Sequence, residues 1–125
     1  MKLSGKVAII TGGSKGIGLG CARVFARHGA AVVLAARGHE TGLAAEQELT
    51  DEGHEARFVP TDVSKPADMQ ALIDTSVARF GRLDCIVNNA GWHPPAMTIE
   101  QVSLEDFESL LRLNLVSTFL GCKLA

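Results

Sequence analysis

The chain has 125 residues, enough for one domain with a hydrophobic core and too few for two. Its formal net charge of −2 excludes the strongly basic surface of a nucleic-acid-binding protein, and no apolar stretch approaches the roughly 20 residues that span a membrane. The three cysteines, Cys21, Cys85 and Cys122, are widely spaced and odd in number, so we expect reduced, buried thiols in a cytoplasmic protein and no metal site.

A glycine-rich turn follows the first predicted strand. Residues 6–11 are apolar on both faces, as in a buried parallel strand. The sequence from Thr11 to Gly18, Thr-Gly-Gly-Ser-Lys-Gly-Ile-Gly, leads into a helix predicted over residues 16–28, which Gly29 ends. The helical period predicts one apolar stripe on this helix, formed by Ile17, Cys21, Val24 and Phe25.

The order of strand, glycine-rich turn and helix is typical of the phosphate cradle in a dinucleotide-binding unit. Gly12 lets the chain leave the strand in a tight turn, and Gly16 and Gly18 carry no Cβ, so a pyrophosphate and the next strand can come close. The start of the helix offers unpaired backbone N–H groups to the phosphates. The spacing Gly-x-x-x-Gly-x-Gly is neither Gly-x-Gly-x-x-Gly nor a P-loop, so a turn without a ligand is the alternative.

Three more strands and three more helices are predicted along the chain. The strands cover Ala31–Ala36, Ala56–Pro60 and residues 84–87. The helices cover residues 40–52, a segment capped by Ser64 that runs to Phe80, and a segment capped by Ser103 that continues to Ala125. Between the last strand and the last helix, Pro94-Pro95 mark residues 92–97 as a loop.

This alternation predicts one α/β unit over residues 1–125, with a doubly wound parallel sheet of the Rossmann type. Right-handed crossovers place the first and fourth strands side by side. Their carboxyl ends carry the glycine-rich turn and the sequence Asn88-Asn89-Ala90-Gly91. We therefore expect these two segments to meet at one edge of the sheet.

Three stretches together resemble the short-chain dehydrogenase/reductase family: residues 11–18, Asp62-Val63 after the third strand, and residues 88–91 after the fourth. The resemblance covers the whole chain, and residues 79–95 are similar to the type 14 17β-hydroxysteroid dehydrogenases. It implies the cofactor-binding part of one dehydrogenase domain, truncated after the fourth strand and the following helix, from an enzyme that forms homo-oligomers. The implied activity is NAD(P)-dependent hydride transfer between nicotinamide and a secondary alcohol or ketone, with a 17β-hydroxysteroid among the candidates.

The resemblance also implies a role for each matching residue. Asp62 would hydrogen-bond the adenine amino group with Val63 beside the ring, and a carboxylate that caps the next helix is the alternative. Asn88, Ala90 and Gly91 would line the cofactor ribose, although a plain turn would also suit these residues. The implied cofactor loop comprises Thr11, Gly12, Ser14, Lys15, Gly16, Ile17 and Gly18.

Asn114 falls on the apolar stripe of the last predicted helix, which also holds Phe107, Leu110, Leu111, Leu115 and Phe119. An unpaired amide there would cost on the order of a few kcal/mol, so we expect it to be hydrogen-bonded, to the backbone in one interpretation. The family resemblance implies a catalytic role for Asn114, in an Asn–Ser–Tyr–Lys tetrad, and both interpretations can hold.

The chain contains no tyrosine. We therefore expect it to be inactive alone, and a module that binds nucleotide or pairs with a subunit is the alternative function.

The end of the second predicted strand bears on the choice of cofactor. Arg37 stands where dinucleotide folds place an acidic residue for the ribose 2′-OH, and Lys15 adds a second positive charge. This pair favours NADP(H), with NAD(H) as the alternative if Arg37 is a solvated loop residue.

His93 follows the cofactor loop and either faces a small-molecule substrate or is exposed. A steroid, a small secondary alcohol and a sugar are all compatible with the sequence.

Overall fold

Four parallel strands form one sheet in the computed structural model, which describes residues 1–93 and 95–125. Their order is β3-β2-β1-β4, with β1 at Val7–Thr11, β2 at Ala31–Ala36, β3 at Ala56–Pro60 and β4 at Cys85–Val87. Ile9 of β1 lies opposite Val33 of β2 and Ile86 of β4. The predicted doubly wound α/β sheet is confirmed, and β1 and β4 are neighbours as expected.

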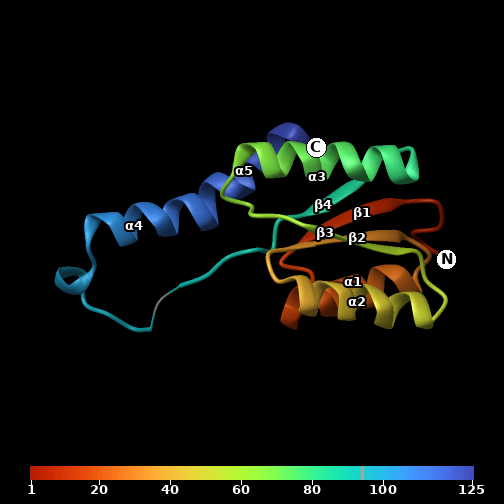
Figure 1. The fold of residues 1–125 in the computed structure, drawn as a ribbon, viewed down its shortest axis with the longest axis horizontal. Coiled ribbons are helices and arrows are strands. Elements are labelled where there is room, and N and C mark those ends of the chain that lie inside the picture. Colours follow the sequence, from red (N-terminus) through yellow and green to blue (C-terminus); the bar gives the residue numbers. More distant parts are fainter. Residues whose placement is uncertain (94) are drawn as a thin grey trace.

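Helices cover both faces of this sheet (Figure 1). α1 (Gly16–Arg27) and α2 (His39–Asp51) lie on one face, and α3 (Pro66–Phe80) and α5 (Ser117–Leu124) lie on the other. The sheet is thus the middle layer of three.

The core consists of two clusters, one on each face of the sheet. Ile10 packs toward α1 and α2 in a cluster that includes Leu49, and Ile9 packs toward α3 in a cluster that includes Met69 and Leu72. Successive residues of a strand point to opposite faces, so a strand covered by helices on both sides must be apolar throughout. All five residues of β1 are buried, which agrees with its continuous apolar sequence.

The buried face of α1 differs from the predicted stripe. Ile17 is 79% exposed and Val24 is 51% exposed, while Cys21 and Phe25 pack at the margin of the core. The buried residues of α1 are Gly18, Leu19, Ala22 and Ala26. The predicted stripe was wrong because the helix approaches the sheet through small side chains, which carry little weight in a hydrophobic pattern.

The start of α3 also differs from the prediction. Lys65 is the N-cap, without a side-chain capping hydrogen bond, and Pro66 is the first residue of the helix. Ser64, the predicted cap, donates instead to the carboxylate of Asp62. The cap prediction was wrong because the N-cap position falls on Lys65, one residue later, which leaves Ser64 in the preceding turn beside Asp62.

Residues 91–93 and 95–116, here called the arm, extend away from the three layers (Figure 1). The arm contains the short helix η1 (Ile99–Gln101), α4 (Leu104–Leu111) and the π-helical turn η2 (Arg112–Val116). Ser103 caps α4 as predicted, since its side chain accepts a hydrogen bond from the Asp106 N–H. The single helix predicted from Ser103 onward is wrong, because η2 separates α4 from α5. Pro94, one of the two prolines behind the loop prediction, lies outside the described residues.

None of the helices in the described part of the chain has both the length and the apolar character needed to cross a bilayer.

Candidate cofactor site

Thr11 and Asn89 join the carboxyl ends of β1 and β4. The Thr11 hydroxyl oxygen accepts hydrogen bonds from the backbone N–H of Asn89 at 2.9 Å and of Ala90 at 3.0 Å. It also donates to the Val87 carbonyl at 3.3 Å, and the Asn89 side-chain amide donates to the Thr11 carbonyl at 3.1 Å. Thr11 is buried. These bonds bring the glycine-rich turn and residues 88–91 together, as the predicted topology required.

The glycine-rich turn passes close to its own helix. Gly12 has a φ of 65°, in the left-handed region that favours glycine, and a Cβ on Gly18 would lie 2.0 Å from the Gly12 carbonyl oxygen. α1 has no side-chain cap and no acidic residue in its first turn. The backbone N–H groups of Gly16, Ile17 and Gly18 donate to none of the described residues. Unpaired N–H groups at a helix start form a site that suits an anion.

A cavity of about 520 Å³, here called the cofactor cavity, opens beside this turn. From the residues named by the sequence it brings together Gly12, Ser14, Lys15, Arg37, Val63, Ala90 and Gly91. It also includes Trp92, from the loop predicted over residues 92–97, and residues that the sequence analysis did not assign, namely Ala35, Ala36, Gly38, Thr41, Thr61 and Leu113. Lys15 and Arg37 are the charged residues in the described lining, which contains no carboxylate. A cavity of this size and charge suits an anionic, nucleotide-sized ligand.

Asp62 is not among the residues that line the cofactor cavity, although the next residue, Val63, is. Asp62 Oδ1 accepts hydrogen bonds from the Ser64 hydroxyl at 2.6 Å and from the Ser64 backbone N–H at 3.0 Å. The side-chain bond is the main reason why the pKa of Asp62 lies below its usual value; partial burial opposes it, and the charges of Arg37 and Lys65 assist. Asp62 is therefore an ionised acceptor. It does not cap α3, whose first turn receives no side-chain capping bond.

The two asparagines after β4 point in different directions. The Asn88 side chain donates to Cys122 Sγ at 3.7 Å, and a Cβ on Gly121 of α5 would lie 2.1 Å from Asn88 Oδ1. Asn88 is absent from the cavity lining, whereas Asn89, which the sequence reasoning did not assign, contacts the glycine-rich turn. The signal that separates them is strand alternation, because Val87 packs on the α1 side and the faces alternate from there.

Asn114 lies in η2 and binds the backbone of the arm. Its side-chain amide donates to the Trp92 carbonyl at 2.8 Å and to the Leu110 carbonyl at 3.0 Å, while its Oδ1 accepts from the Trp92 N–H at 3.0 Å. The amide is thus hydrogen-bonded to the backbone, as one interpretation expected. The residue itself is exposed, which differs from the buried position implied by the apolar stripe.

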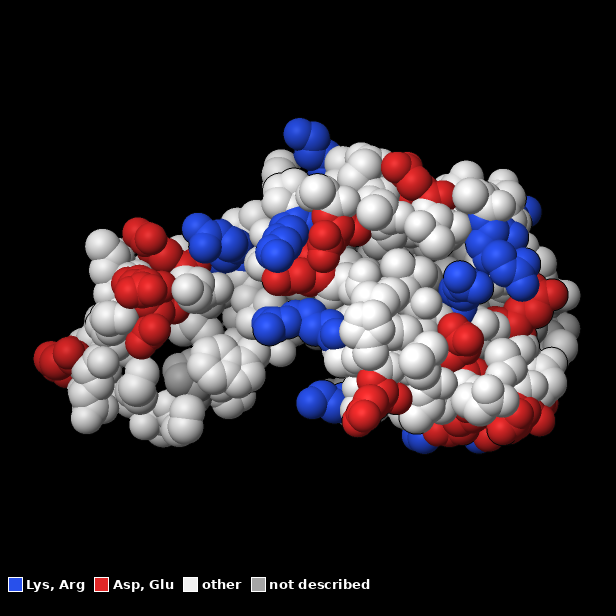
Figure 2. Space-filling view, in the orientation of Figure 1, with Lys and Arg blue, Asp and Glu red and all other residues white. Residues whose placement is uncertain are grey.

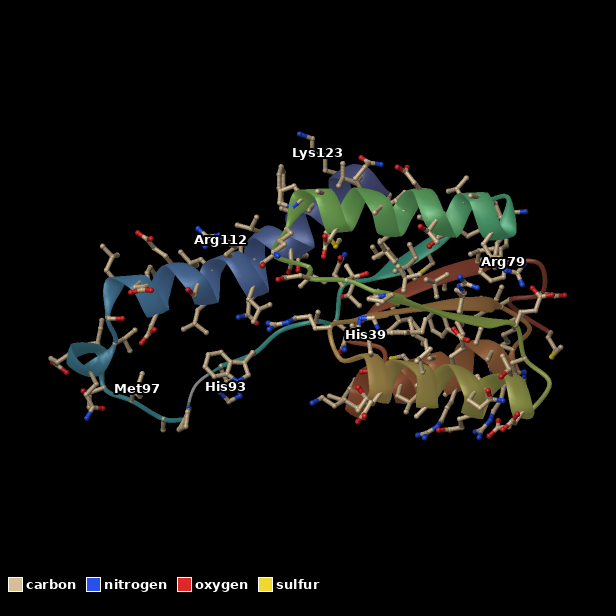
Figure 3. All side chains as sticks on the ribbon, viewed as in Figure 1. His39, Arg79, His93, Met97, Arg112 and Lys123 are labelled. Carbon is tan, nitrogen blue, oxygen red and sulfur yellow. The ribbon has the colours of Figure 1, made fainter. Side chains whose placement is uncertain are left out.

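His93 lies on the loop of the arm (Figure 3). A second cavity of about 470 Å³, lined by His93 together with residues of α4 and η2, shares Gly91 and Trp92 with the cofactor cavity. Figure 2 shows the molecule hollowed between the arm and the layered body. A ligand that extends from the cofactor cavity past Trp92 would approach His93.

Gly38 and Thr41 form the start of α2 and the side of the cofactor cavity that follows Arg37. Gly38 is the N-cap, and the Thr41 hydroxyl donates to its carbonyl at 3.3 Å. The sequence analysis assigned no residue after Arg37 in this loop, so it missed both Gly38 and Thr41. The signal was the loop position after a parallel strand, where ligands bind in open α/β sheets.

Elsewhere, a cavity of about 460 Å³ at the amino ends of the strands contains none of the residues named by the sequence. Among the described residues there is no group of three or more His, Cys, Asp or Glu side chains that could hold a metal ion. The cofactor cavity is therefore the place where the observed geometry and the expected residues coincide.

Comparison with known proteins adds to this geometry. An L-fucose dehydrogenase from Oryctolagus cuniculus is 46% identical over 124 residues, which are 99% of this chain and 42% of that protein. A momilactone A synthase from Oryza sativa subsp. japonica is 46% identical over 123 residues, 98% of this chain and 44% of that protein. The narrower resemblance to type 14 17β-hydroxysteroid dehydrogenases is not shown by these relatives.

A solved structure is similar over the whole chain. A doubly substituted short-chain dehydrogenase/reductase from Serratia marcescens matches with a TM-score of 0.94 and 32% identity, over 100% of this chain and 51% of that one. The chain spans less than half the length of the curated relatives named above. A family model described as short chain dehydrogenase matches residues 6–125. With the fold and the nucleotide-sized cavity, this match shows that the chain belongs to the short-chain dehydrogenase family of oxidoreductases.

Proposed function

We propose that the chain binds NADP(H) as the cofactor half of a dehydrogenase that transfers a hydride between nicotinamide and the carbon of a secondary alcohol or ketone. The observation that carries this proposal is the charge of the cofactor cavity, where Lys15 and Arg37 are present and the described lining has no carboxylate. A carboxylate at the end of β2 would bind the ribose 2′-OH of NAD(H). Two cations favour a 2′-phosphate, which a guanidinium can bind through two parallel hydrogen bonds.

The residues around the cavity fit a dinucleotide. The unpaired N–H groups at the start of α1 can receive a pyrophosphate. Val63 is buried and lines the cavity, yet its backbone N–H donates to none of the described residues. Buried N–H groups without a partner are rare. Adenine carries an amino donor beside a ring acceptor, which matches the Asp62 carboxylate beside the Val63 N–H.

In this assignment each part of the chain has a separate task. Bound NADP(H) supplies the hydride. The glycine-rich turn holds the pyrophosphate, Lys15 and Arg37 hold the 2′-phosphate, and Asp62 with Val63 holds the adenine. Ala90 and Gly91 line the ribose side of the cavity, whereas Asn88 is absent from the lining and its side chain faces α5.

Turnover also needs a general acid–base at the substrate oxygen. The family uses a tyrosine for this role, and these 125 residues contain none. Asn114 is the member of the implied tetrad that they supply. We therefore propose that this chain alone binds the cofactor without catalysing the reaction.

The substrate proposal rests on the relatives and on the arm. The 46% identity to a protein named L-fucose dehydrogenase favours a sugar, and the similarity of residues 79–95 to hydroxysteroid dehydrogenases makes a 17β-hydroxysteroid the second candidate. In both cases His93, in the cavity that adjoins the cofactor cavity, is the residue placed to contact substrate.

A pairing role is the second candidate function, and a specific observation favours it. Phe107, Leu115 and Phe119 are each more than half exposed along α4, η2 and α5. Apolar side chains gathered on one surface mark interaction sites. A homo-oligomer of the full-length protein would cover them. The three free cysteines support a cytoplasmic location for that assembly, although Cys85 and Cys122 are exposed and not buried as expected.

Calorimetric titration of the full-length natural polypeptide with NADPH and with NADH tests the cofactor proposal. We expect NADPH to bind at least about tenfold more tightly, since one charge-assisted contact is worth about 1.5–3 kcal/mol. Tighter binding of NADH would overturn it.

A further inference from the structure

We propose that Ser64 is a positioning residue for adenine recognition: it fixes one oxygen of the Asp62 carboxylate so that the other is left to accept the adenine amino group. This inference rests on the proposed NADP(H) site and assigns a role to a residue that the sequence marked only as a helix cap. The observations behind it are the contacts of Asp62, the orientation of its neighbours and the charges that surround it.

Both donors of Ser64 converge on a single oxygen. The hydroxyl lies 2.6 Å and the backbone N–H 3.0 Å from Asp62 Oδ1. Asp62 Oδ2 accepts no hydrogen bond from the described residues. A carboxylate held at one oxygen by two donors cannot rotate freely, and its second oxygen stays available to a ligand.

The backbone of Asp62 is held as firmly as its side chain. The Asp62 N–H donates to Asp68 Oδ2 at 2.9 Å, and its carbonyl accepts from the Lys65 N–H at 3.0 Å. The next residue, Val63, is buried and lines the cavity, and its backbone N–H donates to none of the described residues. An acceptor and a donor are therefore fixed on adjacent residues. Adenine matches this pair, whereas hypoxanthine, with a carbonyl at position 6 and a protonated ring nitrogen, opposes it at both atoms.

The charges around Asp62 keep its carboxylate an acceptor. The Ser64 hydroxyl makes the largest contribution to lowering the pKa of Asp62, and the cations Arg37 and Lys65 act in the same direction against partial burial. Asp68 is the acidic neighbour, and its carboxylate is occupied by the Asp62 N–H. An ionised carboxylate can only accept, which is the role that an amino group requires of its partner.

The test measures base discrimination in the full-length protein. Dissociation constants are determined by calorimetry for NADP⁺ and for nicotinamide hypoxanthine dinucleotide phosphate, which differs only in the base. We expect the wild-type protein to prefer NADP⁺ by at least about tenfold, the size of one charge-assisted hydrogen bond. Ser64→Ala should reduce this preference by at least about threefold, toward the value for Asp62→Ala, in which the Val63 N–H alone still discriminates, and Ser64→Thr, which keeps the hydroxyl, should restore it.

A matched control separates positioning from stability. Ser103→Ala removes the cap of α4 on the arm, so it should lower the unfolding temperature and leave base discrimination unchanged. A Ser64→Ala protein that is less stable but discriminates like the wild type would assign Ser64 a structural role only and overturn the inference. Should that variant not fold, Ser64→Cys, of similar size and with a weaker donor, is measured in its place.

The outcomes for the two proposals are distinguishable. Absence of NADP⁺ binding by the wild-type protein overturns the proposed function. Tight NADP⁺ binding with no preference over the hypoxanthine analogue overturns the role of Asp62, and with it that of Ser64, while the cofactor site stands. Full discrimination in Ser64→Ala overturns the inference alone.

Discussion

Asn114 holds the backbone of Trp92 at both of its polar groups: Oδ1 accepts the Trp92 N–H at 3.0 Å, and the side-chain nitrogen donates to the Trp92 carbonyl at 2.8 Å. The two residues are 22 positions apart, one on the loop that leaves the cofactor cavity and the other in the π-helical turn. One amide therefore ties the two sides of the arm together. His93 is the residue that directly follows this tie.

Replacing Asn114 should loosen the arm without unfolding the layered body. In Asn114→Ala we expect the Trp92 amide to exchange its hydrogen faster by about fivefold to tenfold, corresponding to about 1 kcal/mol for the lost bonds. Hydrogen exchange followed by mass spectrometry or NMR measures this. Ser109→Ala on the neighbouring α4 is the control and should leave the Trp92 amide unchanged. Equal exchange in both variants would mean that the loop is held by other contacts.

Arg37→Ala should weaken NADP(H) binding selectively. Loss of the guanidinium should cost about 1.5–3 kcal/mol of NADPH binding free energy and leave NADH nearly unaffected, because only the 2′-phosphate differs between them. Titration of the full-length variant with both cofactors measures the difference. Arg27→Ala is the matched control, since Arg27 lines the cavity at the amino ends of the strands. An equal loss for both cofactors would place Arg37 elsewhere on the dinucleotide.

Replacement by alanine at two glycines of α1 should change the stability of the protein in opposite directions. A Cβ at Gly18 would meet the Gly12 carbonyl oxygen at 2.0 Å, so Gly18→Ala should displace the turn, lower stability and abolish cofactor binding. A Cβ at Gly20 meets nothing within 4 Å, so Gly20→Ala should stabilise the helix by about 0.5–1 kcal/mol. Urea unfolding of both variants measures the two signs. A Gly18→Ala protein with wild-type stability would contradict the close approach.

Thr11→Val should destabilise the junction of β1 and β4. The substitution conserves shape but removes the oxygen that accepts from the Asn89 and Ala90 N–H groups. Leaving two partly buried donors unpaired should cost about 2 kcal/mol or more. Thr50→Val on exposed α2 is the control and should change stability by less than about 0.5 kcal/mol. Chemical unfolding gives both values, and an unchanged Thr11→Val midpoint would show that the two N–H groups find other partners.

Asp84 should make stability depend on pH in the acidic range. Hydrogen bonds from Arg82 and then from the Val7 backbone N–H hold the pKa of Asp84 below its ordinary value of 3.8. Because the pKa is lower in the folded state, Asp84 contributes stability above the ordinary value, and this contribution is lost as the pH falls through the folded-state pKa.

Asp84→Asn should therefore be less stable than the wild type at pH 7, with a difference that shrinks as the pH falls below about 4. Urea unfolding at pH 7 and pH 3 measures this change. Asp51→Asn, at an exposed carboxylate bonded to Gln47, serves as the control and should show little difference at either pH. If Asp84→Asn is less stable than the wild type by the same amount at both pH values, the packing of the side chain matters and its charge does not.

The parts of the fold that depend on long apolar strands and on glycine were predictable from the sequence. The runs before Thr11 and at Ala31–Ala36 are apolar on both faces, which is typical of strands between two helix layers. Gly12, Lys15 and Arg37 were found because strand ends in a parallel sheet meet at one edge, and they do line one cavity.

The features that depend on the local three-dimensional arrangement of the chain could not be predicted from the sequence. Ser64 was expected to cap α3, but the residue at which the helix begins decides this, and the N-cap position falls on Lys65. The face of α1 was missed because the sheet selects Ala22 and Ala26 for their small size. The π-helical turn was missed because the period of an apolar stripe does not report a single wider turn.

The two cations of the cofactor cavity belong to turns after β1 and β2, while Trp92, His93 and Asn114 belong to the arm. In the proposed enzyme, the choice between phosphorylated and unphosphorylated cofactor is encoded before residue 40, and the substrate side of this chain is encoded after residue 90. Trp92 lines both cavities, but the two cations and His93 do not share a cavity. In the proposed enzyme, the cofactor preference and the substrate preference can therefore be altered by largely separate substitutions.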